Sequence, residues 1–195
     1  MPEYSVFYEA TPNPQSMKFI VTAMISPESA NFTNANEAQR SPLAQKLLGF
    51  PWAAGVFIGP TFVTVTKQEW VDWDVIAEPL SELIKEHLVR GEPVIHPAQS
   101  TEGRQYFASG EASTEDAEGD SPTVLKIKKI LREEIRPAVA MDGGDITFSK
   151  FEDGRVYLQM QGACSGCPSS AYTLKEGIET RLRDAIPEIQ EVIAI

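Results

Sequence analysis

One stretch in the middle of the chain constrains how the rest can fold. Residues 96–121 carry six acidic side chains against one basic side chain, and residues 111–120 read EASTEDAEGD. The stretch has few apolar residues and no periodicity of 2 or 3.6, so it cannot bury enough surface to offset the entropy lost on ordering. We therefore predict an acidic flexible linker at 96–121, which joins two small domains at 1–95 and 122–195.

Charge and hydropathy exclude several classes of protein. The net charge of −11 divides into −5 over residues 1–95, −5 over the linker and −1 over residues 122–195. An acidic surface repels phosphate backbones, which excludes nucleic acid as a partner. No run approaches the roughly 18 consecutive apolar residues of a membrane helix, so we expect no membrane association.

Cysteine usage and the N-terminal residues bear on the compartment. Two cysteines cannot build a disulfide scaffold, and the first four residues, MPEY, lack the basic and apolar regions of a signal peptide. We therefore expect a reducing compartment, the cytoplasm of a bacterium. A processed organellar form is the alternative.

Both domains mix strand and helix patterns. The predicted class is α+β, with two small α/β sandwich domains, each a mixed sheet with helices on one face. In residues 1–95 the expected strands lie at 4–8, 19–25, 56–58 and 62–66, and the expected helices run from Ser41 to Gly49 and from Asp72 or Asp74 to Gly91. In residues 122–195 we expect helices at 124–139, kinked at Pro137, and at 174–185, with strands at 146–151, 156–160 and 192–195.

The most informative motif lies between a predicted strand and a predicted helix. Residues 161–170 read QGACSGCPSS, which places Cys164 and Cys167 three residues apart in one loop. Two thiols at this spacing can bind one centre, as in zinc sites and iron-sulfur clusters. Pro168 suits the first position of the following helix, and the partial positive charge at that N-terminus favours thiolate.

A four-coordinate zinc site or a cubane cluster needs two more ligands than these cysteines supply. His87 and His96 have no ligand spacing to the cysteines, and we interpret both as ordinary surface histidines. The missing thiolates would come from another protein or from a second copy of the loop, and a two-fold dimer is the more economical arrangement. A dithiol-disulfide oxidoreductase and an incidental cysteine pair remain as alternatives.

A second motif, DGGD at residues 142–145, admits two interpretations. Its two carboxylates could bind a hard cation, but the further oxygens that Ca²⁺ needs are missing. We favour a glycine turn that leads into the first strand of the domain.

In their order along the chain, these motifs closely resemble the NifU/Nfu family. The C-terminal domain carries Arg136-Pro137, DGGDI at 142–146, GACSGCPSS at 162–170 and TLKEGIE at 173–179. The first domain is similar to the family's N-terminal domain, with TPNP at 11–14, SPLA at 41–44 and Trp70.

This resemblance implies an iron-sulfur cluster scaffold or carrier and not an enzyme. It implies that Cys164 and Cys167 of two protomers bind a bridging 4Fe-4S cluster, 2Fe-2S being possible, and that the homodimer receives the cluster from an upstream donor. Apo iron-sulfur client proteins would then receive it. The N-terminal domain is expected to recognise other proteins.

Overall fold

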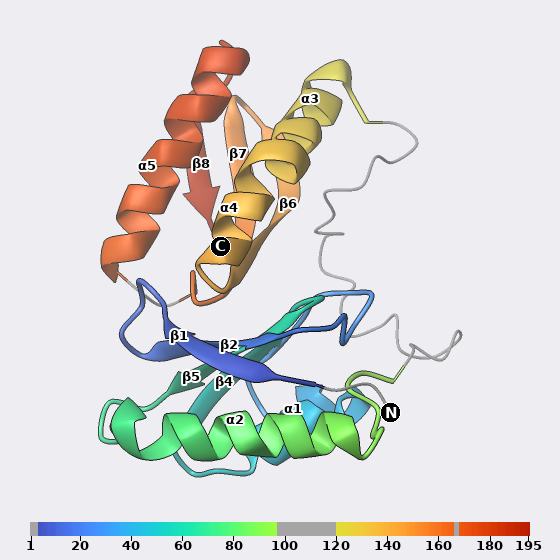
Figure 1. Ribbon diagram of the computed structural model, residues 1–195. Coiled ribbons are helices and arrows are strands. Elements are labelled where there is room, and N and C mark those ends of the chain that lie inside the picture. The colour runs from blue at the N-terminus through green and yellow to red at the C-terminus, as the bar shows by residue number, and fades with distance from the viewer. Residues whose placement is uncertain (1–3, 97–119, 166–167) are drawn as a thin grey trace. The chain divides into compact units, whose positions relative to one another are not determined.

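The computed structural model describes residues 4–96, 120–165 and 168–195, with side chains for all of these except residues 168–174. The chain divides into two compact units, Met1–Gln99 and Ser100–Ile195, and each mixes helices with a sheet (Figure 1). The α+β class is confirmed. Residues 97–119, nearly all of the predicted linker, lie outside the described residues. No helix in the described part of the chain has the length and apolar character needed to span a membrane.

The first unit is a five-stranded sheet with helices packed on one face (Figure 1). Its strands are β1 (Val6–Ala10), β2 (Ser16–Val21), β3 (Ala30–Phe32), β4 (Ala53–Ile58) and β5 (Phe62–Lys67); its helices are the short η1 (Glu37–Arg40), α1 (Pro42–Leu48) and α2 (Trp73–Val89). The strand order is β1-β2-β5-β4-β3, and every neighbouring pair is antiparallel. The prediction of a mixed sheet is therefore wrong for this unit, because no helix here serves as a crossover between neighbouring parallel strands.

Local signals set most of these elements. The N-cap Ser41 accepts a hydrogen bond from the backbone N–H of Ala44 at 3.1 Å, as predicted from Ser41-Pro42. The strand predicted over 19–25 ends at Val21 instead, because the chain then leaves the sheet and the Ile25 N–H bonds the Pro60 carbonyl at 2.7 Å. Strand β3 was not predicted, since three residues are too short to show an alternation.

The second unit has a three-stranded mixed sheet, as predicted. Its strands are β6 (Gly144–Glu152), β7 (Arg155–Gly162) and β8 (Glu191–Ala194); its helical segments are α3 (Pro122–Ile130), η3 (Leu131–Ile135), α4 (Arg136–Met141) and α5 (Pro168–Ala185). The central β7 pairs antiparallel with β6 and parallel with β8. The helices lie on one face of this sheet (Figure 1).

The first helix of the second unit is continuous but irregular. Pro137 has no N–H to give to the carbonyl four residues earlier, and η3, just before it, is a π-helical turn. There the Arg136 N–H bonds the Leu131 carbonyl, five residues back. The helix is therefore irregular just before Pro137, in the form of a π turn, and α4 then leads into the Asp142–Asp145 turn.

Candidate functional site

The cysteine loop connects the end of β7 to the start of α5. Gly162, the last residue of β7, has φ of +65°, a left-handed conformation that glycine adopts without strain. Both the backbone N–H and the hydroxyl of Ser165 donate to the Gly162 carbonyl, at 3.1 and 2.9 Å. These bonds turn the chain sharply after the strand and place Cys164 inside the turn. Cys167 lies outside the described residues, so its place beside Cys164 stays a prediction.

Cys164 is a core residue as well as a loop residue. The residue is only 6% exposed and belongs to the apolar cluster that fills the second unit. The sequence placed Cys164 in a loop, and the fold buries it in the core as well. A cysteine side chain is small and apolar enough to pack in this way. The next residue, Ser165, is exposed.

The Asp142–Asp145 turn forms the seat on which Cys164 rests. The Ala163 N–H donates to the Gly143 carbonyl at 3.2 Å, which ties the cysteine loop to this turn. A Cβ placed on Gly144 would lie 2.5 Å from the Cys164 sulfur and 2.8 Å from the Gln161 carbonyl oxygen. Only glycine leaves room there for the sulfur. The interpretation as a glycine turn is confirmed, since Gly143 has φ of +80° and β6 begins at Gly144.

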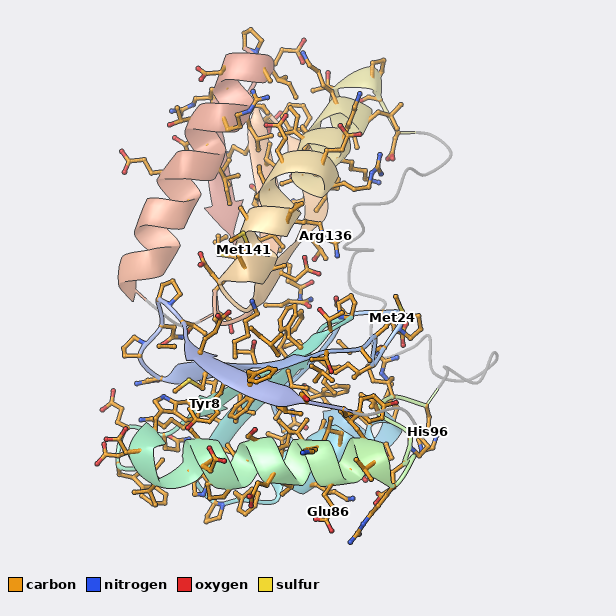
Figure 2. The ribbon with its side chains drawn as sticks, viewed as in Figure 1. Tyr8, Met24, Glu86, His96, Arg136 and Met141 are labelled. Carbon is orange, nitrogen blue, oxygen red and sulfur yellow. The ribbon has the colours of Figure 1, made fainter. Side chains whose placement is uncertain are left out.

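An ion pair joins this turn to α4, the helix that precedes it in the chain. The guanidinium of Arg136 donates two hydrogen bonds to the Asp145 carboxylate, both at 2.7 Å, and the Ile146 N–H donates a third at 2.8 Å. The Asp145 side chain is 8% exposed and that of Arg136 is 31% exposed. The Asp145 carboxylate is therefore bound to Arg136 (labelled in Figure 2). Only one of the two carboxylates of DGGD, that of Asp142, then remains for the interpretation as a cation site.

This pairing was missed at the sequence level, although both residues stood within the recognised motifs. The second glycine of the DGGD motif was a usable signal for this close packing. The turn conformation needs a glycine only at Gly143, which has a positive φ, and not at Gly144. The extra glycine indicates a close approach by another part of the chain. Spacing alone could not say that Cys164 makes that approach.

The two histidines, both in the first unit, differ in burial. His87 is fully buried in the first unit, so its interpretation as a surface residue is wrong, whereas His96 is exposed as expected. The Nε2 of His87 lies 3.1 Å from the Pro93 carbonyl oxygen, and burial lowers the pKa of His87 below its ordinary value of 6.5. In the described residues no group of three or more His, Cys, Asp or Glu side chains could hold a metal.

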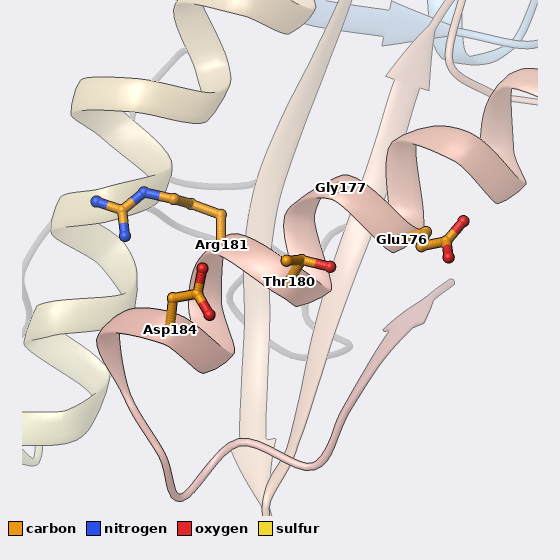
Figure 3. Close-up of a pocket in the computed structure, with 5 residues that line it drawn as sticks. All are labelled: Glu176, Gly177, Thr180, Arg181 and Asp184. Carbon is orange, nitrogen blue, oxygen red and sulfur yellow. The ribbon is translucent and has the colours of Figure 1, made fainter.

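A shallow depression lies along the outer face of α5 (Figure 3). It is lined by Glu176, Gly177, Thr180, Arg181 and Asp184. Arg181 reaches across to Glu134 with two hydrogen bonds of 2.6 and 2.7 Å, and the pairing lowers the pKa of the Glu134 carboxyl. Because all five lining residues belong to one helix, the depression has no opposing wall and cannot enclose a substrate.

Known proteins combine these two domains. The family described as NifU-like domain matches residues 127–193, and the family described as scaffold protein Nfu/NifU N terminal matches residues 6–91. The fold and the glycine-seated cysteine thus belong to a two-domain protein with a NifU-like C-terminal unit. The chain is a member of the NifU/Nfu family.

Curated relatives carry the same pair of domains in longer chains. The proteins of Drosophila erecta and Drosophila yakuba, each named "NFU1 iron-sulfur cluster scaffold homolog, mitochondrial", are 42% identical to this chain over 184 residues. The match covers 93% of this chain and 62% of each relative. The solution structure of the NifU-like protein from Saccharomyces cerevisiae shares 29% identity, covers 51% of this chain and 87% of its own, and superposes with a TM-score of 0.42.

These relatives correct one expectation. A bacterial cytoplasmic location was predicted, but the curated relatives are named mitochondrial, which points to an organellar protein. The cysteine argument excluded only an oxidising compartment and could not distinguish one reducing compartment from another. The remaining argument rested on the first four residues of a chain that matches only part of its relatives.

Proposed function

We propose that this chain is an iron-sulfur cluster scaffold or carrier. Two observations support the proposal: the NifU-like unit seats a cysteine on a glycine at a strand-to-helix junction, and the curated relatives are named iron-sulfur cluster scaffold homologues. The cluster is the cargo that the protein holds and hands on. Cys164 and Cys167 supply the thiolates, and Gly144 leaves the space in which the Cys164 sulfur sits.

The cargo is a 4Fe-4S cluster bridged by the cysteine loops of two protomers. A cubane takes four thiolates, and each chain has two cysteines in all, so two loops together complete the set. A two-fold axis brings identical loops face to face. Four thiolates around the cluster leave it negatively charged, and the N-terminus of α5, which begins at Pro168, offsets part of that charge.

Transfer proceeds by ligand exchange and needs no enzymatic acid or base. Each incoming thiolate of an apo client replaces one outgoing cysteine thiolate on the cluster, so charge and ligand number stay balanced at each step. The exchange runs downhill when the four ligands of the client bind more tightly. An upstream donor supplies the cluster in the same way. The protein is accordingly a carrier and not an enzyme.

The alternative function is a dithiol-disulfide oxidoreductase that uses the same pair of cysteines. The two functions separate in an insulin reduction assay. We expect no reduction of insulin disulfides by the chain, and reduction at the rate of a thioredoxin would favour the redox function.

We further propose the domain boundaries 1–95, 96–121 and 122–195. The division into two compact units supports them. Limited proteolysis should cut first within 96–121 and leave two resistant fragments, and early cuts within either domain would contradict the boundaries.

The function itself is tested by anaerobic reconstitution with iron and sulfide. Wild type should bind cluster, and Cys167→Ser should bind none while the hydrogen exchange of both units is unchanged. Glu176→Gln, an exposed change on α5, is the matched control and should bind cluster like wild type. Cluster retention by the cysteine variant would refute the proposed ligands.

A further inference from the structure

The outer edge of β1 has an unusual character for the border of a sheet. Natural sheets protect their edges with short strands, prolines, lysines or bulges. β1 runs for five residues in unbroken register with β2, and its sequence VFYEA contains no proline, lysine or bulge; its one charged residue, Glu9, pairs with Lys18 of β2. The opposite edge, β3, has three residues. Phe7, on β1, is 60% exposed.

The hydrogen-bond pattern shows which backbone groups of β1 point outward. The Thr22 N–H donates to the Ser5 carbonyl at 3.2 Å, so Ser5 and, by alternation, Phe7 and Glu9 bond to β2. Val6, Tyr8 and Ala10 therefore direct their backbone groups away from β2. The hydroxyl of Ser81 on α2 donates a hydrogen bond to the Val6 carbonyl oxygen at 3.1 Å. No hydrogen bond to the outward groups of Tyr8 and Ala10 occurs within the described ranges.

The two faces beside this edge differ in chemistry. On the helix side, the Tyr8 hydroxyl donates to the Glu78 carboxylate at 3.2 Å, and this hydrogen bond, followed by the charges of Glu78 and Asp74, raises the pKa of Tyr8. Both carboxylates are exposed on α2 and form no ion pair within the described residues. On the other side, Phe7 lies opposite Ile20 and offers an apolar surface. One face of the edge is thus acidic, and the other presents Phe7 beside Glu9, whose charge is offset by the ion pair with Lys18 at 3.0 Å.

We propose that the outer edge of β1 binds an extended segment of a partner protein in which basic and apolar side chains alternate. Successive residues of a strand point to opposite faces, so residues opposite Tyr8 would meet the α2 carboxylates, and their neighbours would cover Phe7. A second copy of the chain fits less well, because each first unit carries a net charge of −5 and two copies repel each other. The residues of this site belong to β1 and α2, and none of them belongs to the cysteine loop.

The test uses the full chain without cluster and a seven-residue peptide of alternating lysine and valine. We expect saturable binding by isothermal titration calorimetry, with slower hydrogen exchange at the amides of Tyr8 and Ala10. A peptide with methylated lysine backbone nitrogens keeps its charge but loses the donors that face Tyr8. It should bind at least tenfold more weakly, and equal binding would overturn the proposal.

Substitutions separate edge pairing from general attraction to an acidic protein. Ala10→Pro removes an outward N–H and should weaken binding about tenfold, whereas Ala10→Val keeps the N–H and should bind like wild type. Glu78→Gln should weaken binding a few-fold, and Glu86→Gln, on the same helix at the place labelled in Figure 2, should not. Equal effects of the two glutamate variants would refute edge binding. A chain that dimerises in sedimentation and becomes monomeric in Ala10→Pro would assign the edge to a second copy instead.

Discussion

Replacing Gly144 with alanine tests the seat of Cys164 by the smallest possible change. The added methyl group would lie 2.5 Å from the Cys164 sulfur, 2.8 Å from the Gln161 carbonyl oxygen and 3.3 Å from the Cys164 Cβ. The carbonyl cannot move easily, because Gln161 pairs with Asp145 within the sheet. The sulfur must therefore move out of its place in the core.

The expected cost follows from overpacking a core. Inserting a methyl group into a packed interior costs about 1–3 kcal/mol, and the backbone contact places this site near the upper end, at about 2–3 kcal/mol. The loss should lower hydrogen-exchange protection in the second unit by about 30-fold or more. The displaced sulfur should also reduce the iron bound on reconstitution.

The assay must report on the second unit alone. Trp52, Trp70 and Trp73 all lie in the first unit, so tryptophan fluorescence does not report on the second. Exchange of the amides of β7, the central strand, does. Gly177→Ala is the matched control: apart from its chain neighbours and its own helix backbone, no atom lies within 4 Å of the added methyl group, so alanine in this helix should stabilise the unit by about 0.5–1 kcal/mol. Wild-type protection and full iron binding in Gly144→Ala would refute the seat.

Three further changes probe contacts elsewhere. Arg136→Met leaves the buried Asp145 carboxylate without its guanidinium and should destabilise the second unit by about 2–4 kcal/mol in the same exchange assay; no change would mean that the pair is dispensable. Because burial lowers the pKa of His87, the unfolded chain binds the proton more readily, and the stability of the first unit should fall as the pH drops below 6.5. Urea titrations followed by tryptophan fluorescence should show this slope in wild type and a smaller one in His87→Gln; equal slopes would refute it. Ser41→Ala removes both the helix cap and the 2.6 Å hydrogen bond to the Val94 carbonyl, so it should cost about 2 kcal/mol in those titrations, and an unchanged midpoint would contradict the cap.

Local patterns predicted those elements whose stability depends on local contacts. The cap at Ser41, the glycine turn at Gly143 and the long helix α2 each follow from a few neighbouring residues. Strand β3 escaped because its place depends on pairing with β4, more than twenty residues later. The burial of His87 was missed because it depends on how α2 packs within the folded unit, which neighbouring residues do not reveal.

In the candidate site, too, features set by neighbouring residues were predicted and contacts between distant residues were not. The loop that carries Cys164 was found from its spacing and its flanking glycines. Its seat was not, because the contact between Cys164 and Gly144 joins residues on different elements. The Arg136–Asp145 pair likewise joins α4 to β6. Motifs in the sequence therefore located the chemistry, and the fold shows how one of its residues is held.

The central claim is that two chains share one cluster. Anaerobic reconstitution should give about two irons and two sulfides per chain, in a species with the mass of two chains in solution. Cys167→Ser should give neither the cluster nor the dimer. A monomer that binds a single zinc ion and takes up no sulfide would contradict the account.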